Sequence, residues 1–135
     1  MRRMMSAVTA LAVAAALGMA TAAAAADQPT VTSLMTKELT GAPGKEGAMI
    51  TVEFPPGWVS AAHRHDAHTF VYVLEGSVVM GVQGGQEMTL GPGQTFYENP
   101  SDVHSVSRNA STTKPAKLLV FLVKEKDKPI STPVK

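Results

Sequence analysis

Residues 57–76 read GWVSAAHRHDAHTFVYVLEG, and this stretch decides what fold and chemistry to expect. Side chains at alternate positions of a β-strand lie on the same face of the sheet. His63 and His65 therefore project to one side if this segment is a strand. Residues 69–74, which are β-branched, aromatic or aliphatic, give the strongest strand signal in the chain. His104 follows a later Gly-Pro-Gly turn, and from another strand it would complete a three-nitrogen metal site.

The rest of the chain repeats one pattern, in which short apolar or alternating runs are separated by glycine, proline and asparagine turns. This pattern predicts strands over residues 48–54, 59–65, 69–74, 77–82, 87–90, 94–98, 103–107 and 116–124. The last of these contains the unbroken apolar run 118–123 and is expected to be fully buried. No segment among them has helical periodicity, so we expect a single all-β domain, a sandwich or a small barrel.

The first 26 residues are expected to be a targeting segment rather than part of the fold. Met1-Arg2-Arg3 is a basic start, the apolar run 7–20 is short for a membrane span, and the alanines before Asp27 offer small-residue cleavage sites. This pattern is typical of a secretory signal peptide, although a retained membrane anchor is the alternative. We therefore expect a periplasmic or secreted protein, divided into a cleaved signal peptide (1–26), an N-terminal arm or edge strand (27–45), a β-barrel (46–124) and a flexible C-terminal tail (125–135).

Composition excludes several classes of function. The sequence has no cysteine, which excludes disulfides, thiolate catalysis and cysteine-based zinc sites. Residues 27–135 carry ten Lys or Arg and eleven Asp or Glu, so a nucleic-acid partner, which needs a basic stripe, is not expected. No second apolar segment predicts membrane attachment after cleavage. About 109 residues are few for a solitary barrel, so we expect a homodimer, with the strand around Val120 as one edge that could pair.

The stretch from Gly57 to Gly76 resembles the first conserved motif of the cupins: a glycine, five residues, His-x-His, three or four residues, a glutamate, six residues and a glycine. Residues 93–109, GQTFYENPSDVHSVSRN, resemble the second motif, whose histidine falls at His104. The resemblance implies a jelly-roll β-barrel that encloses one divalent transition metal, with His63, His65 and His104 as ligands. Because imidazole ligands are permissive, the metal is expected to be Fe, Mn, Zn or Ni.

One position departs from the motif, because Thr69 stands where the cupins have a carboxylate ligand. Either the site has three histidines and waters, or another acid substitutes. Glu98, beside aromatic neighbours, is our candidate for a ligand, a partner of a ligand or a general base, and a solvent-facing rim position is the alternative. Strand alternation places Thr69 in the pocket with the histidines and His68 on the opposite face, unless a bulge reverses the order.

Two tyrosines, Tyr72 and Tyr97, are further candidates for the substrate pocket, although tyrosine is also an ordinary strand residue. The sequence as a whole predicts an exported metal-dependent enzyme, dioxygenase-like or isomerase/lyase-like, that acts on a small polar molecule. The alternative is a cupin module that binds a small ligand or a metal without turnover. The position of the Glu98 carboxylate discriminates between them, because a base must reach the metal or its water.

Overall fold

The computed structural model describes residues 27–135, so the predicted signal peptide at residues 1–26 lies outside the described part. The described residues form strands and turns without a helix, and hence without a helix that could cross a membrane. The strands are β1 (Thr30–Glu38), β2 (Lys45–Phe54), β3 (His63–Arg64), β4 (Ala67–Glu75), β5 (Val78–Val82), β6 (Met88–Leu90), β7 (Thr95–Glu98), β8 (His104–Asn109), β9 (Ala116–Glu125) and β10 (Thr132–Pro133).

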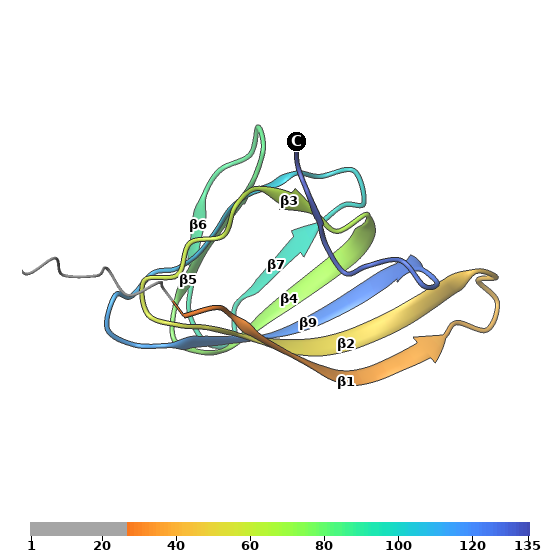
Figure 1. Ribbon diagram of the computed structural model, residues 1–135, viewed down its shortest axis with the longest axis horizontal. Coiled ribbons are helices and arrows are strands. Elements are labelled where there is room, and N and C mark those ends of the chain that lie inside the picture. Colours follow the sequence, from red (N-terminus) through yellow and green to blue (C-terminus); the bar gives the residue numbers. More distant parts are fainter. Residues whose placement is uncertain (1–26) are drawn as a thin grey trace, which may run out of the picture.

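The strands form two five-stranded sheets in which every pairing is antiparallel. The first sheet has the order β1-β2-β9-β4-β7, and the second has the order β10-β3-β8-β5-β6. Figure 1 shows the long strands of the first sheet as one layer, with β3 above them and β5 and β6 to their left. Neighbours in each sheet are mostly distant in sequence, as in a jelly roll. The predicted all-β jelly-roll fold is confirmed.

The hydrophobic core lies between the inner faces of these sheets. In β4 every second residue is buried, from Ala67 through Val71 to Val73, while the residues between them are exposed. Leu118, Val120 and Leu122 of β9 and buried residues of β5 complete the contact. Removing these side chains from water is the main favourable contribution to folding, so the alternation fixes which face of each strand turns inward.

The structure corrects the prediction that residues 118–123 are fully buried. Along β9 alternate residues are buried and the residues between them, such as Phe121, are only half-buried. No second layer formed by residues 27–135 covers the outer face of this sheet, so its apolar side chains stay partly accessible. Because β9 lies between β2 and β4, the strand around Val120 is also not an edge that could pair with a second copy.

The predicted strand over residues 59–65 is shorter than expected. Only His63–Arg64 has regular strand geometry, and Val59 makes an isolated bridge to Arg108 of β8. Asp66 follows with a positive φ of 50°, which turns the chain from one sheet into the other. The two sheets are thus joined at the point where the candidate ligands lie.

Both the backbone conformation and the neighbouring atoms require a glycine at position 76, which closes the first motif. Its φ is +74°, and a Cβ atom would lie 2.5 Å from the carbonyl oxygen of Pro115 and 2.8 Å from Cα of Ala116. We predict that Gly76→Ala lowers the free energy of unfolding by at least about 2 kcal/mol, because a left-handed backbone cost adds to a backbone clash. Urea denaturation measures the loss.

Gly84 offers a matched control, since its φ of +82° is similar but a Cβ atom would have no neighbour within 4 Å. Gly84→Ala isolates the backbone cost, roughly 1 kcal/mol. Equal destabilisation by the two substitutions would show that the clash at Pro115 does not matter.

Candidate metal centre

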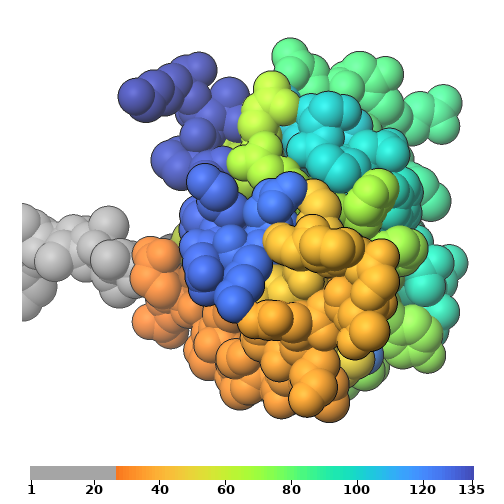
Figure 2. Space-filling model, turned by 90° about the vertical axis from the view of Figure 1, so that its right-hand side faces the viewer, coloured from red at the N-terminus to blue at the C-terminus, as the bar shows by residue number. Residues whose placement is uncertain are grey.

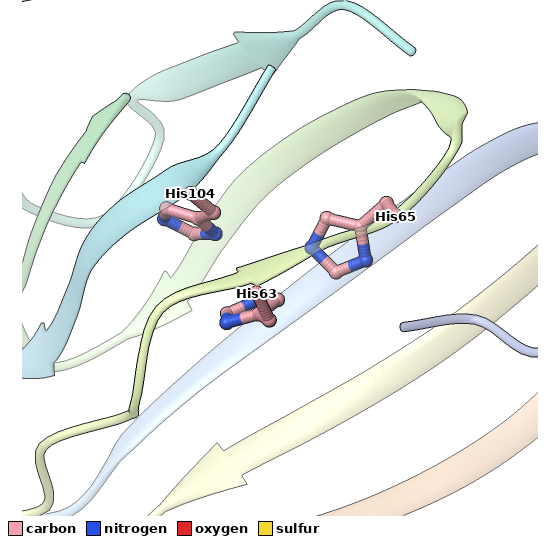
Figure 3. A group of neighbouring side chains, drawn as sticks. All are labelled: His63, His65 and His104. Atoms are coloured by element: carbon pink, nitrogen blue, oxygen red, sulfur yellow. The ribbon is translucent and has the colours of Figure 1, made fainter. Parts of the chain in front are cut away.

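Three imidazole rings meet at the junction of β3 and β8. His63 lies in β3, His65 follows it two positions later, and His104 begins β8 directly opposite His63 in the antiparallel register. Each ring offers one nitrogen, and these three atoms lie within 4.8 Å of one another. Figure 3 shows the three rings gathered beside the two strands. The predicted convergence of three histidines is confirmed, and they are positioned to hold a metal ion.

Backbone carbonyls orient two of the three rings. Nδ1 of His63 lies 2.9 Å from the carbonyl oxygen of Ala61, and Nδ1 of His65 lies 2.6 Å from the carbonyl oxygen of Ile130. A carbonyl oxygen only accepts, so each Nδ1 carries the hydrogen and donates it. The lone pair of each ring is therefore on Nε2, which is the arrangement that a metal ligand needs. Arg64, between them, turns away and donates to the carbonyl oxygen of Ser101 at 2.6 Å.

The third ring, His104, faces the carboxyl group of Glu98 inside the molecule. The two side chains are 4% and 2% exposed, and Nδ1 of His104 lies 3.2 Å from Oε1 of Glu98. This approach lacks hydrogen-bond geometry, so Oε1 and both ring nitrogens are buried without a partner among the described residues. Buried polar atoms normally have partners because leaving them unpaired costs about 1–3 kcal/mol each. A divalent cation would take up the imidazole lone pairs, so the three histidines fit a metal.

Burial acts on the charge of both groups. It raises the pKa of Glu98 to about 7, with a smaller contribution from the Asp102 carboxylate. It lowers the pKa of His104 to about 3, assisted by repulsion from His63 and His65. The pKa of His65 is also lowered, again mainly by burial. Burial thus disfavours both the ionised carboxylate of Glu98 and the protonated imidazole of His104. The imidazole therefore stays in the neutral form that binds metals.

The register explains how Glu98 reaches this position. Thr69 of β4 is 1% exposed on the inner face and pairs directly with Glu98 of β7. Directly opposite residues of an antiparallel pair have Cβ atoms about 5 Å apart. Position 69 has no carboxyl group, but that of Glu98 therefore enters the same space from the neighbouring strand β7. Oε1 of Glu98 also lies 3.8 Å from Nε2 of His65.

The structure corrects the assignment of the two tyrosines to the substrate pocket. Tyr72 and Tyr97 are 44% and 42% exposed on the outer face of the first sheet, because each is one position out of phase with an inward neighbour. His68 is exposed on the same side, as alternation predicts, and its Nδ1 lies 2.6 Å from the hydroxyl oxygen of Tyr97. Tyr72 and Tyr97 line an outer groove with Phe70 and Phe121, and the histidine cluster is on the other side of the sheet.

Comparison with known proteins identifies the family. The family model described as "Cupin domain" matches residues 50–122. The chain belongs to the cupin family. No curated protein matches this cupin, but many solved structures do.

Three solved structures illustrate the fold likeness. The DMSP lyase DddQ from Ruegeria pomeroyi is 21% identical with a TM-score of 0.64, and the match covers 80% of this cupin and 52% of that chain. An oxalate oxidase in complex with glycolate is 22% identical with a TM-score of 0.58, covering 78% and 54%. An uncharacterized double-stranded β-helix protein from Klebsiella pneumoniae is 16% identical with a TM-score of 0.60, covering 80% and 85%. This cupin thus spans about half the length of the lyase and of the oxidase.

A cavity of about 430 Å³ opens from the histidine cluster between the two sheets of this cupin. Glu98 and Thr69 line it together with the three histidines. Residues from the C-terminal segment, Ile130 among them, also contribute to its wall. Within this segment, which the sequence predicts to be a flexible tail, β10 pairs with β3. Figure 2 shows this segment, in dark blue, at the surface beside the lime segment that includes β3.

No pattern in the sequence indicates that Ile130 contributes to the site. It contributes a main-chain carbonyl, which every residue has, so no residue type marks it. A neighbouring contact also has no signal in the sequence. Nζ of Lys124 donates to the carbonyl oxygen of Lys128 at 2.6 Å and forms a buried ion pair with Glu46. Together these contacts hold the tail against the metal centre.

Proposed function

We propose that this cupin is an exported metal-dependent enzyme, dioxygenase-like or isomerase/lyase-like, that acts on a small polar molecule. The observation that carries the proposal is the buried, unpartnered carboxyl oxygen of Glu98, 3.2 Å from a candidate ligand ring. A site that only stores a metal or a ligand needs no unpaired acid beside it. A site that moves protons does need one, within reach of the bound molecule.

Each residue has a distinct part in this proposal. His63, His65 and His104 would hold one divalent ion, Fe, Mn, Zn or Ni. When bound, that ion supplies a Lewis acid or, if it is redox-active iron, a centre for oxygen chemistry. The carbonyl oxygens of Ala61 and Ile130 keep two of the ligand rings in place. Oε1 of Glu98 accepts a proton from the bound molecule or its water.

The alternative is a non-catalytic module that binds a small ligand or a metal. Our sequence criterion was the direction of Glu98, and its inward position favours the enzyme. The similar structures include a DMSP lyase and an oxalate oxidase, which supports an enzymatic function on this fold. Their own substrates are not carried over to this chain at 21% and 22% identity. Export to the periplasm or beyond and a homodimer remain predictions from the sequence.

Glu98→Gln tests the proposal. The metal is first identified in protein purified without a histidine tag, and a substrate screen is then chosen by that metal. We expect the substitution to lower turnover of any substrate found by about 10²–10⁴-fold, because a general base contributes that much. The amide is nearly isosteric, so thermal unfolding should stay cooperative.

Glu75→Gln is the matched control, since Glu75 is an exposed carboxylate at the end of β4. It should retain wild-type turnover. Wild-type turnover in Glu98→Gln as well would remove Glu98 from the chemistry and return the chain to the binding alternative.

A further inference from the structure

The cavity beside the histidines has apolar walls. Side chains from both sheets line it, including Ile50, Phe54 and Leu118 from the first sheet and Met80 from the second. All four belong to the buried hydrophobic core. The polar lining consists of the histidine end, where Glu98 and Thr69 lie, of the indole Nε1 of Trp58 and of a few hydroxyl groups. A molecule that fills this space would therefore bury most of its surface against hydrocarbon.

No lysine or arginine lines the cavity among the described residues. Arg64 and Lys124 lie on strands that contribute to the lining, and both have other partners, because Arg64 donates to the carbonyl oxygen of Ser101 and Lys124 is paired with Glu46. The walls instead contribute the carboxyl group of Glu98. An anionic group placed along these walls would lose its hydration without gaining a cationic partner, which is strongly unfavourable.

The rim of the cavity is apolar as well. It includes Pro29 and Val31 from the N-terminal end of the described chain and Ile130 and Pro133 from the C-terminal segment. Val31 is 50% exposed, so this rim presents hydrocarbon to solvent. A ligand that enters past this rim meets apolar contacts before it reaches the histidines. Neither the rim nor the walls thus recognise a charged molecule.

We infer that the cavity takes a small molecule with an uncharged, apolar body, whose oxygen- or nitrogen-bearing end is directed at the three histidines. The direction of the ligand's polar end rests on the proposed function, whereas its apolar body is inferred from the lining residues alone. The inference narrows the expected small polar substrate to one whose polarity is confined to one end. A cavity of about 430 Å³ is within the usual range for such ligands.

Two fluorescent probes that differ by one charge test this inference. N-phenyl-1-naphthylamine is neutral, and 8-anilinonaphthalene-1-sulfonate carries the same rings with an added sulfonate. Each is titrated into metal-free full-length protein, and the rise in fluorescence gives a dissociation constant. We expect the neutral probe to bind at least about tenfold more tightly to the metal-free protein, because no lysine or arginine among the described lining residues can pair with the sulfonate. Equal affinities, or no binding of the neutral probe, would overturn the inference.

Variants locate the bound probe. Ile50→Phe and, separately, Val120→Phe place extra volume in the cavity, and each should abolish binding of the neutral probe while thermal unfolding stays cooperative. The matched control is the pair Phe70→Ser with Tyr97→Ser, which removes two exposed rings of the outer groove. A signal that is lost in this control and retained in the filled variants would place the probe outside and reject the inference.

A separate cobalt titration distinguishes failure of the inferred ligand class from failure of the proposed metal-dependent function. Cobalt binding together with a failed probe assay rejects the ligand class and leaves the metal centre standing. Probe binding in the cavity without cobalt binding supports the apolar ligand body and rejects the metal-dependent function.

Discussion

Replacing both His63 and His104 with alanine is expected to reduce the divalent metal bound per chain from about one to a background level. The two residues face each other across β3 and β8, and only His65 remains in the double variant. A single imidazole cannot fix a divalent ion against water, since protein sites for such metals use three or more ligands. Elemental analysis of protein purified without a histidine tag measures the metal content.

The fourth histidine of the chain provides the control. His68 is exposed on the outer face and contacts Tyr97, so His68→Ala changes the histidine count without touching the cluster. This variant should keep the wild-type metal content. If the double variant also keeps it, the three rings do not form the metal site, and the proposed function fails with them.

The part of the site that strand geometry determines could be predicted from the sequence. The spacing of His63 and His65 places both rings on one face, and alternation along β4 places Thr69 inward and His68 outward. The same rule would have placed Tyr72 outward, because it is three positions from Thr69. The exposure of Tyr72 can thus be derived from the sequence. Its assignment to the pocket considered only the polar hydroxyl group and not the direction of the side chain.

Contacts across turns and between distant segments could not be predicted. A turn separates Glu98 from His104, and alternation cannot be followed through it. Only the register between β4 and β7 shows that Glu98 lies opposite Thr69. The contribution of the C-terminal segment is harder still to predict, because it consists of a backbone carbonyl and the pairing of β10 with β3.

A chain that ends at Lys128 is expected to bind cobalt or zinc about 10–100-fold more weakly than the full chain, which is the usual cost of losing a hydrogen-bond partner of a metal-binding histidine. The truncation removes the carbonyl oxygen of Ile130, which holds Nδ1 of His65 at 2.6 Å. It also removes β10, which pairs with the strand that carries His63. Competition with a chromophoric chelator, starting from metal-free protein, measures the affinity.

The contact of Lys124 with the carbonyl oxygen of Lys128 and with Glu46 is upstream of this cut, so the body of the fold should remain and thermal unfolding checks it. A chain that ends at Pro133 is the matched control, because it loses two residues but keeps Ile130 and both residues of β10. The shorter chain should lose affinity and the longer one should not. Equal affinities would mean that neighbouring packing alone fixes the ring of His65, whereas the expected difference would make the C-terminal segment a working part of the metal centre.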